Sequence, residues 1–231
     1  MFAIFKRDFC SLFNSIIGYI VFFVFLVFSG LFFYGTCLYQ KNANVTYVFS
    51  NMCFIIAVLI PMLTMKTFSE GKNQILLTSP VSLIKVVLGK FFAVTIYYLI
   101  CISIFFVYGI VIACFTTPDW ATLFCNMLGL FLIGSALISA GVFISSLTNN
   151  SVIAAIGAIG AGLFLFFGYD FLINFIPNDS IKGSFSEASF MIHYNNFTIG
   201  ILNLADTCFF ISVCALFIFL TIRVFDKRRY S

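Results

Sequence analysis

Few side chains in this sequence could carry out catalysis. His193 is the one histidine, and no carboxylate pair or Ser/His/Asp spacing would bring an acid, a base and a nucleophile together. The phosphate-binding pattern GxxxxGK[ST] does not occur, since Gly71-Lys72 and Gly89-Lys90 lack the leading glycine and the following Ser or Thr. We therefore expect no catalytic residue, and no ATP hydrolysis by this chain itself.

The eight cysteines do not indicate a metal site or a disulfide framework. They form no CxxC pair, and nearly all lie in or beside apolar segments, where cysteine behaves as a small apolar residue. We expect them to pack, and we expect no bound metal.

The elements that must position these residues are long apolar runs. The chain of 231 residues is 62% apolar and 9% charged, with a mean hydropathy of +1.14. A hydrocarbon core ~30 Å thick needs roughly 20 apolar residues to cross as a helix, and continuous apolar runs favour helices over a β-barrel. The sequence predicts an all-α, multi-pass membrane protein of one domain, 1–231. Its six predicted spans are 16–38, 47–68, 84–114, 122–147, 152–173 and 207–225.

Basic residues predict the orientation of these spans. With both termini on one side, ten of the twelve Lys and Arg fall on that side, and Lys41 and Lys182 fall on the other. Because basic residues concentrate in cytoplasmic loops, we expect both termini in the cytoplasm. The excess of basic over acidic residues then indicates anionic lipid headgroups as partners, and not nucleic acid.

Residues 1–15 have the pattern of a helix lying along the inner membrane surface. Phe5 and Phe9 belong to an apolar series spaced by three and four residues, while Lys6 and Arg7 fall on the other side. Such a helix is either a structural anchor or a lever that passes motion to the first span.

The cytoplasmic segment 69–83 combines charge with the apolar triplet Ile75, Leu76 and Leu77. A helix there would end before Pro80, because proline disfavours helical geometry in the preceding residue and has no N–H to donate. An apolar cluster facing the cytoplasm favours a protein partner, and the alternative is insertion into lipid headgroups.

Two further patterns concern packing and the outer surface. Ser184 and Glu187 form a capping-box pattern, so the outer segment 174–206 is predicted to contain short re-entrant helices. Small residues on two spans allow close helix approach, either within the subunit or between two copies. These small residues are Gly134, Gly141, Ala154, Gly157, Ala158 and Gly162.

Acids and bases near the middle of the spans would indicate an ion-coupled carrier, and the middles contain none. Asp170 lies near the outer end of a span and is interpreted as an interfacial acid. Asp206 stands where the N-cap of the last helix is predicted, and we favour capping over ligand binding.

Several stretches of the chain, in order, resemble permeases of type-2 ABC exporters, in the branch associated with gliding motility. The N-terminal stretch Phe5-Lys-Arg-Asp8 is similar to the family's surface helix. The strongest similarity is to the family's segment that contacts the ATPase. It consists of Pro61-Met-Leu-Thr-Met65, Phe68, Glu70, Leu76-Leu-Thr-Ser-Pro-Val-Ser82 and Leu88-Gly-Lys-Phe91.

The resemblance implies a subunit of the bacterial cell membrane that binds no cofactor itself. Its implied partners are cytoplasmic ABC ATPase subunits holding ATP and Mg, a second permease copy or a sibling permease, membrane lipids and an additional extracytoplasmic subunit. It places ATPase coupling at Phe68, Glu70, Ile75, Leu76, Leu77, Thr78, Ser79 and Pro80. It places an outer gate at His193, Phe197, Gly200 and Asp206.

Two other functions are compatible with the same sequence. One is an ion- or proton-coupled carrier, but the absence of charged residues from the middle of the spans counts against it. The other is a non-transporting scaffold or mechanotransmitter that uses the same ATPase. For an exporter, the phenylalanine-rich spans, with 34 Phe in the chain, suggest a lipidic or hydrophobic peptide substrate.

Overall fold

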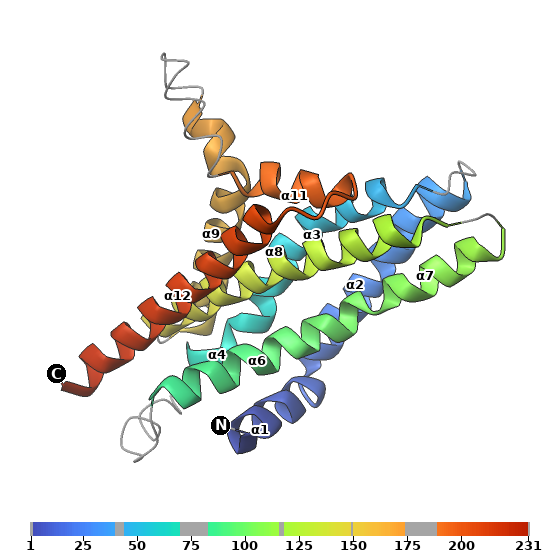
Figure 1. Ribbon diagram of the computed structural model, residues 1–231. Coiled ribbons are helices and arrows are strands. Elements are labelled where there is room, and N and C mark those ends of the chain that lie inside the picture. The colour runs from blue at the N-terminus through green and yellow to red at the C-terminus, as the bar shows by residue number, and fades with distance from the viewer. Residues whose placement is uncertain are drawn as a thin grey trace.

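The computed structural model describes residues 2–39, 44–69, 83–115, 118–148, 150–173 and 189–230, and no strand occurs within these ranges. The predicted all-α class is confirmed, and Figure 1 shows the helices gathered into one bundle. The helices are α1 (Phe2–Phe13), α2 (Ile16–Phe33), the π-helical turn η1 (Tyr34–Leu38), α3 (Thr46–Thr64), α4 (Lys66–Ser69), α6 (Leu83–Ile102), α7 (Ile104–Ala113), α8 (Trp120–Leu147), α9 (Ser151–Ile173), α11 (Phe190–Thr198) and α12 (Leu204–Tyr230).

Five helical segments are long and apolar enough to cross a membrane, which is the architecture of a multi-pass membrane protein. They match five of the six predicted spans. The predicted fifth span is α9, a helix of 23 residues whose described apolar stretch, Ser151–Phe166, is shorter than a full span. The five segments are Ile16–Leu38, Thr46–Thr64, Leu83–Ala113, Trp120–Leu147 and Leu204–Lys227.

Two predicted spans are interrupted where the sequence analysis expected continuous helix. The second span was predicted to reach residue 68, but α3 ends at Thr64 and the chain turns at Met65 before α4. The third span divides at Ser103, whose hydroxyl donates to the Ile100 carbonyl at 2.7 Å. A Ser hydroxyl that competes for backbone carbonyls often bends a helix. The apolar content from which the span was predicted does not reveal such a bend.

Helix α8 forms the centre of the bundle and is the most buried of the five spanning segments. Figure 1 shows it in the middle, and α3, α6, α9, α11 and α12 all pack against it. Small residues along α8 allow this, because they let neighbouring helices approach closely in an apolar solvent. At Gly134, for example, a Cβ atom would overlap the ring of Tyr98 on α6.

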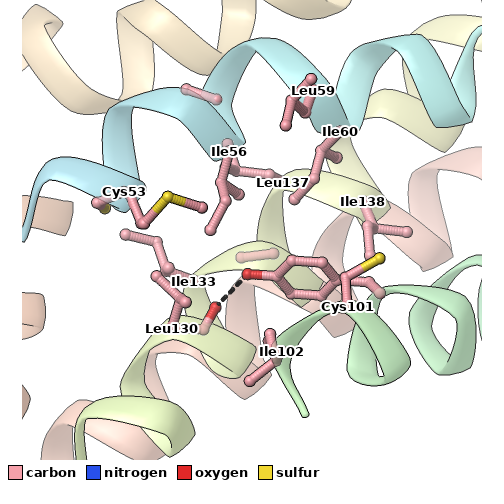
Figure 2. Close-up of a cluster of buried hydrophobic side chains, with 14 of the residues drawn as sticks. Cys53, Ile56, Leu59, Ile60, Cys101, Ile102, Leu130, Ile133, Leu137 and Ile138 are labelled. Atoms are coloured by element: carbon pink, nitrogen blue, oxygen red, sulfur yellow. Dashed lines mark hydrogen bonds between the residues drawn. The ribbon is translucent and has the colours of Figure 1, made fainter. Parts of the chain in front are cut away.

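The middle of the bundle is an apolar core. Figure 2 shows branched side chains of α3 and α8 meeting around the hydrogen bond that Tyr98 donates to the Leu130 carbonyl at 2.8 Å. Cys53 and Cys101 are buried there, so these cysteines pack as predicted. Among the described residues, the buried charged side chains are Lys90 and Asp206, and neither belongs to this core cluster.

Helix α1 has the predicted two-sided pattern. Lys6 and Arg7 are exposed, while Phe9 and Phe13 are half-buried against the core. The Phe13 ring lies 5.0 Å from the ring of Tyr97, so α1 packs against α6. The structure therefore attaches α1 to a spanning helix through aromatic contacts.

Candidate functional site

The strongest functional arrangement lies where the chain leaves α3 and enters the segment 69–83. The side chain of Phe68, in the one-turn helix α4, is 2% exposed. Its ring centroid lies 4.7 Å from that of Phe225 on α12, and the Nζ atom of Lys90 on α6 lies 4.2 Å from the same ring. An aromatic residue in α4 thus joins the N-terminal part of α6 to the C-terminal part of α12.

The backbone of this turn is held by α8. The Phe68 N–H donates to the Ser145 hydroxyl at 3.0 Å, and that hydroxyl donates to the Met65 carbonyl at 3.2 Å. Backbone groups that lose their helical partners must be satisfied elsewhere when they are buried, and Ser145 is fully buried. We call the set Met65, Thr67, Phe68, Lys90, Ser145 and Phe225 the inner junction.

Lys90 is the charged member of the inner junction. It lies seven positions after the first residue of α6, is buried, and donates from Nζ to the Thr67 carbonyl. A buried ammonium group needs hydrogen-bond acceptors, and the face of an aromatic ring adds electrostatic attraction. These two interactions fix the position of the Lys90 side chain relative to α4.

Lys90 enters the sequence analysis only within the stretch Leu88-Gly-Lys-Phe91, and Thr67, Ser145 and Phe225 have no role in it. A signal for Lys90 is present in the sequence, because an ionisable residue inside a predicted span is a functional candidate by default. No comparable signal identifies Ser145 or Phe225, because serine and phenylalanine are common in spans and their roles here depend on contacts between distant parts of the chain.

Of the residues predicted for ATPase coupling, the structure places Phe68 in the inner junction. The others, Glu70, Ile75, Leu76, Leu77, Thr78, Ser79 and Pro80, lie outside the described residues. The Ser184 and Glu187 pattern also lies outside them, as does the side chain of Asp170.

A second polar cluster ties α11 to α12. The carboxylate of Asp206 is 2.5 Å from His193 Nδ1 through one oxygen and accepts from Asn196 Nδ2 at 2.9 Å through the other. The His193 ring stacks on Phe209, with centroids 4.2 Å apart. The predicted outer residues His193 and Asp206 are therefore in direct contact.

The prediction that Asp206 caps the last helix is wrong. Helix α12 begins at Leu204, so Asp206 lies within its first turn. The cap is Asn203, whose side-chain oxygen accepts from the Ala205 N–H at 3.1 Å. The carboxylate of Asp206 instead accepts from α11, because α11 packs beside the start of α12 and presents His193 and Asn196 to it.

Phe197 and Gly200, the other two predicted outer residues, shape and dock α11. Phe197 is fully buried against α8, where a Cβ atom added to Gly129 would come within 2.5 Å of the Phe197 Cβ. Gly200 has φ +90, which an L side chain rarely adopts, and its N–H donates to the Phe197 carbonyl at 3.0 Å as α11 ends.

Helix α11 is also tied to α3. The Tyr194 hydroxyl donates to the Phe49 carbonyl at 3.0 Å, and the Thr46 hydroxyl donates to the Thr198 carbonyl at 3.1 Å. Together with the contacts to α8 and α12, these bonds dock the nine residues of α11 against three spanning helices.

The predicted small residues mostly pack within the chain. A Cβ atom on Gly141 would overlap the side chain of Thr64, and one on Gly162 would lie 3.3 Å from the Ala57 carbonyl. Ala154 and Ala158 are buried on α9, and Gly157, although more exposed, faces α8, since a Cβ atom there would lie 3.1 Å from the Ile144 side chain. These contacts within the chain favour packing within the subunit.

Within the described part of the chain, no group of three or more His, Cys, Asp or Glu side chains could hold a metal ion. Both clusters join helices: the inner junction links α4 to α6, α8 and α12, and the second cluster links α11 to α12.

No protein-family model matches the chain, and no curated protein matches it either.

Proposed function

We propose that this chain is the transmembrane permease subunit of an ATP-driven ABC exporter, forming the translocation path with a second permease subunit. The observation that supports this most is the inner junction. The segment 69–83, which resembles the ATPase-contacting part of such permeases, begins one residue after Phe68, and Phe68 contacts α6, α8 and α12. A displacement of that segment is then transmitted to three spanning helices.

The energy required favours a broad and rigid contact with the ATPase. Moving a two-state equilibrium from 1:99 to 99:1 takes about 5.5 kcal/mol of differential binding. An exposed ion pair at Glu70 would supply only about 0 to 1 kcal/mol. The apolar triplet and the Pro80 turn must contribute as well. Because Phe68 is buried, it keeps its place when the ATPase pushes on the segment that follows it.

The same proposal includes six spans, with α9 as the fifth, and both termini in the cytoplasm. Figure 1 shows α1, α4 and the C-terminal end of α12 at the same end of the bundle, and an even number of spans is what returns the chain to its starting side. Lys6, Arg7, Arg223 and Lys227 are exposed at that end, which favours a cytoplasmic location in a bacterial cell membrane. Short re-entrant helices in 174–206, including α11, complete the outer side.

ATP hydrolysis belongs to the partner in this proposal. The chain has no phosphate-binding loop, and its two buried charged side chains are Lys90 and Asp206 in the described part. ATP and Mg would be held by the cytoplasmic ATPase subunits, while this chain changes conformation.

The test begins with affinity purification of the chain from its native membrane. We expect a Walker-motif ATPase to co-purify and ATP to drive movement of a solute across reconstituted vesicles. Phe68→Ala should lower the ATPase stimulation by the permease, while Phe164→Ala, which alters an exposed phenylalanine of α9, should leave it unchanged.

Two results would contradict the proposal. One is a native complex without any ATPase, and the other is nucleotide cleavage by the purified chain alone. An ATPase that binds and hydrolyses ATP while no solute moves would favour the scaffold or mechanotransmitter.

A further inference from the structure

Helix α6 carries two lysines in contrasting surroundings. Lys85 is exposed, whereas Lys90, five positions later, is 9% exposed and lies against Thr67 and Phe68 of α4. Burying an ammonium group costs free energy unless it is paired, so the position of Lys90 needs a compensating interaction.

The compensation comes from the turn that precedes 69–83. The Thr67 carbonyl, near the end of α4, accepts from Lys90 Nζ, and the Phe68 ring presents its face to the same atom at 4.2 Å. The attraction between a cation and a ring increases when both are shielded from water, as they are here.

Phe68 is also held by contacts with α12 and α8. Phe225 of α12 lies 4.7 Å from it, centroid to centroid, and the Phe68 N–H is bound to Ser145 of α8. Lys90 therefore supplies the contact that brings α6 into a junction whose other contacts come from α8 and α12.

We propose that Lys90 is a positioning residue for ATPase coupling. Its ammonium group holds Phe68 and the Thr67 carbonyl, and so fixes the position of α4, the element that immediately precedes the coupling segment in the chain. The inference rests on the proposed function for its consequence, but the clamp itself is a property of the chain alone.

Charge is the property that matters, so the substitutions are chosen to separate charge from volume. Lys90→Met keeps an unbranched apolar stem but removes the cation and leaves the half-buried Thr67 carbonyl without this donor. Lys90→Arg keeps the cation, the donors and the ability to stack on the ring. Lys85→Met is the matched control on the exposed side of the same helix.

The first measurement is hydrogen–deuterium exchange of the purified full chain, read at the segment containing Phe68. This amide reports on the clamp because it is hydrogen-bonded to Ser145 in the closed junction. We expect Lys90→Met to accelerate its exchange by about tenfold, the size of effect that a shielded cation–ring contact supports. Lys85→Met should leave the exchange unchanged, and Lys90→Arg should restore most of the protection.

Lys90→Gln provides a second variant if Lys90→Met does not fold. It keeps a hydrogen-bond donor but removes the cation that faces the Phe68 ring, and we expect faster exchange at the same amide. Exchange equal to that of the unsubstituted chain in Lys90→Met, or in Lys90→Gln where Lys90→Met does not fold, would overturn the clamp.

The second measurement uses the complex with its ATPase. We expect Lys90→Met to reduce permease-dependent ATPase stimulation severalfold, with Lys90→Arg restoring it. Faster exchange combined with unchanged stimulation would overturn the positioning role and leave the proposed function intact. A chain whose exchange responds as expected but which binds no ATPase would overturn the proposed function, while the clamp would stand.

Discussion

At the scale of single residues, the same amino acid has opposite roles on different helices. Gly134 on α8 lies directly against the Tyr98 ring, whereas Gly160 on α9 has open space where a Cβ atom would be. Tyr98 is fixed in that place, because it is buried and donates to the Leu130 carbonyl at 2.8 Å. The glycine is therefore required at one site and costly to helix stability at the other.

Gly134→Ala is expected to destabilise the chain by about 1 to 3 kcal/mol, because the new methyl group overlaps a buried ring that cannot move freely. Gly160→Ala should be neutral or stabilising by up to about 1 kcal/mol, since alanine is the better helix former. Unfolding of the detergent-solubilised variants, followed by circular dichroism, measures both. Equal stabilities of the two variants would contradict the packing of Tyr98 against Gly134.

At the scale of elements, α11 is held by directional polar bonds rather than by its length. A helix of nine residues is marginal on its own, so it depends on docking. The docking bonds come from Asp206, Phe49 and Thr46 on two other helices. Changes in those partners should loosen α11 before they affect the central helices.

Asp206→Asn tests this dependence. An amide at this position replaces one accepting oxygen with a donor, so one partly buried group on His193 or Asn196 loses its acceptor. We expect a loss of about 1 to 3 kcal/mol in the docking of α11, detected as faster hydrogen exchange at 190–198. Asp226→Asn, near the other end of α12, serves as the control and should not change that exchange.

The start of α8 should depend on pH. The Thr122 hydroxyl and N–H, which donate to the Asp119 carboxylate, lower the pKa of that carboxyl below its usual value of 3.8. Because the pKa is lower in the folded chain, the capping contribution is complete at neutral pH and is lost as pH falls through the lowered pKa.

Thr122→Val should raise the Asp119 pKa towards its ordinary value, while Thr122→Ser should keep it low, because serine retains the hydroxyl that donates to the carboxylate. A carbon-13 NMR titration of the Asp119 carboxyl measures the difference. Identical titration of the valine and serine variants would show that the hydroxyl does not set the pKa.

At the scale of the whole molecule, α12 connects the two polar clusters. Asp206 and Phe225 are nineteen positions apart on this helix, about 28 Å at 1.5 Å per residue. That length is close to the ~30 Å hydrocarbon thickness, so the proposed topology puts the His193–Asp206 cluster and the inner junction near opposite membrane surfaces. One helix therefore contributes to both candidate sites.

The proposed topology can be tested with two native cysteines. Cys10 on α1 and Cys114 at the end of α7 are both exposed and are separated by three predicted spans. In intact cells, a membrane-impermeant maleimide should label a variant that retains only Cys114, and should not label one that retains only Cys10. Permeabilised cells provide the control, in which both should react. Labelling of Cys10 in intact cells would reverse the proposed orientation.

Apolar content along the chain was enough to predict the helical class, the membrane-spanning architecture and most span boundaries to within a few residues. This was predictable because a bilayer demands about 20 continuous apolar residues and satisfies no backbone group, so local composition is enough. The two-sided pattern of α1 was predictable for the same reason, since it depends on residues three and four positions apart.

Only the tertiary structure decided how those helices use their polar residues. Lys90 meets Phe68 across 22 positions of sequence, and Asp206 accepts from a neighbouring helix instead of capping its own. The different roles of Gly134 and Gly160 also depend on what each glycine faces, which is the Tyr98 ring at Gly134 and open space at Gly160. Such contacts arise when different helices pack together. The periodicity of side chains along one helix predicts which of its faces is buried, but not which residue of another helix that face will meet.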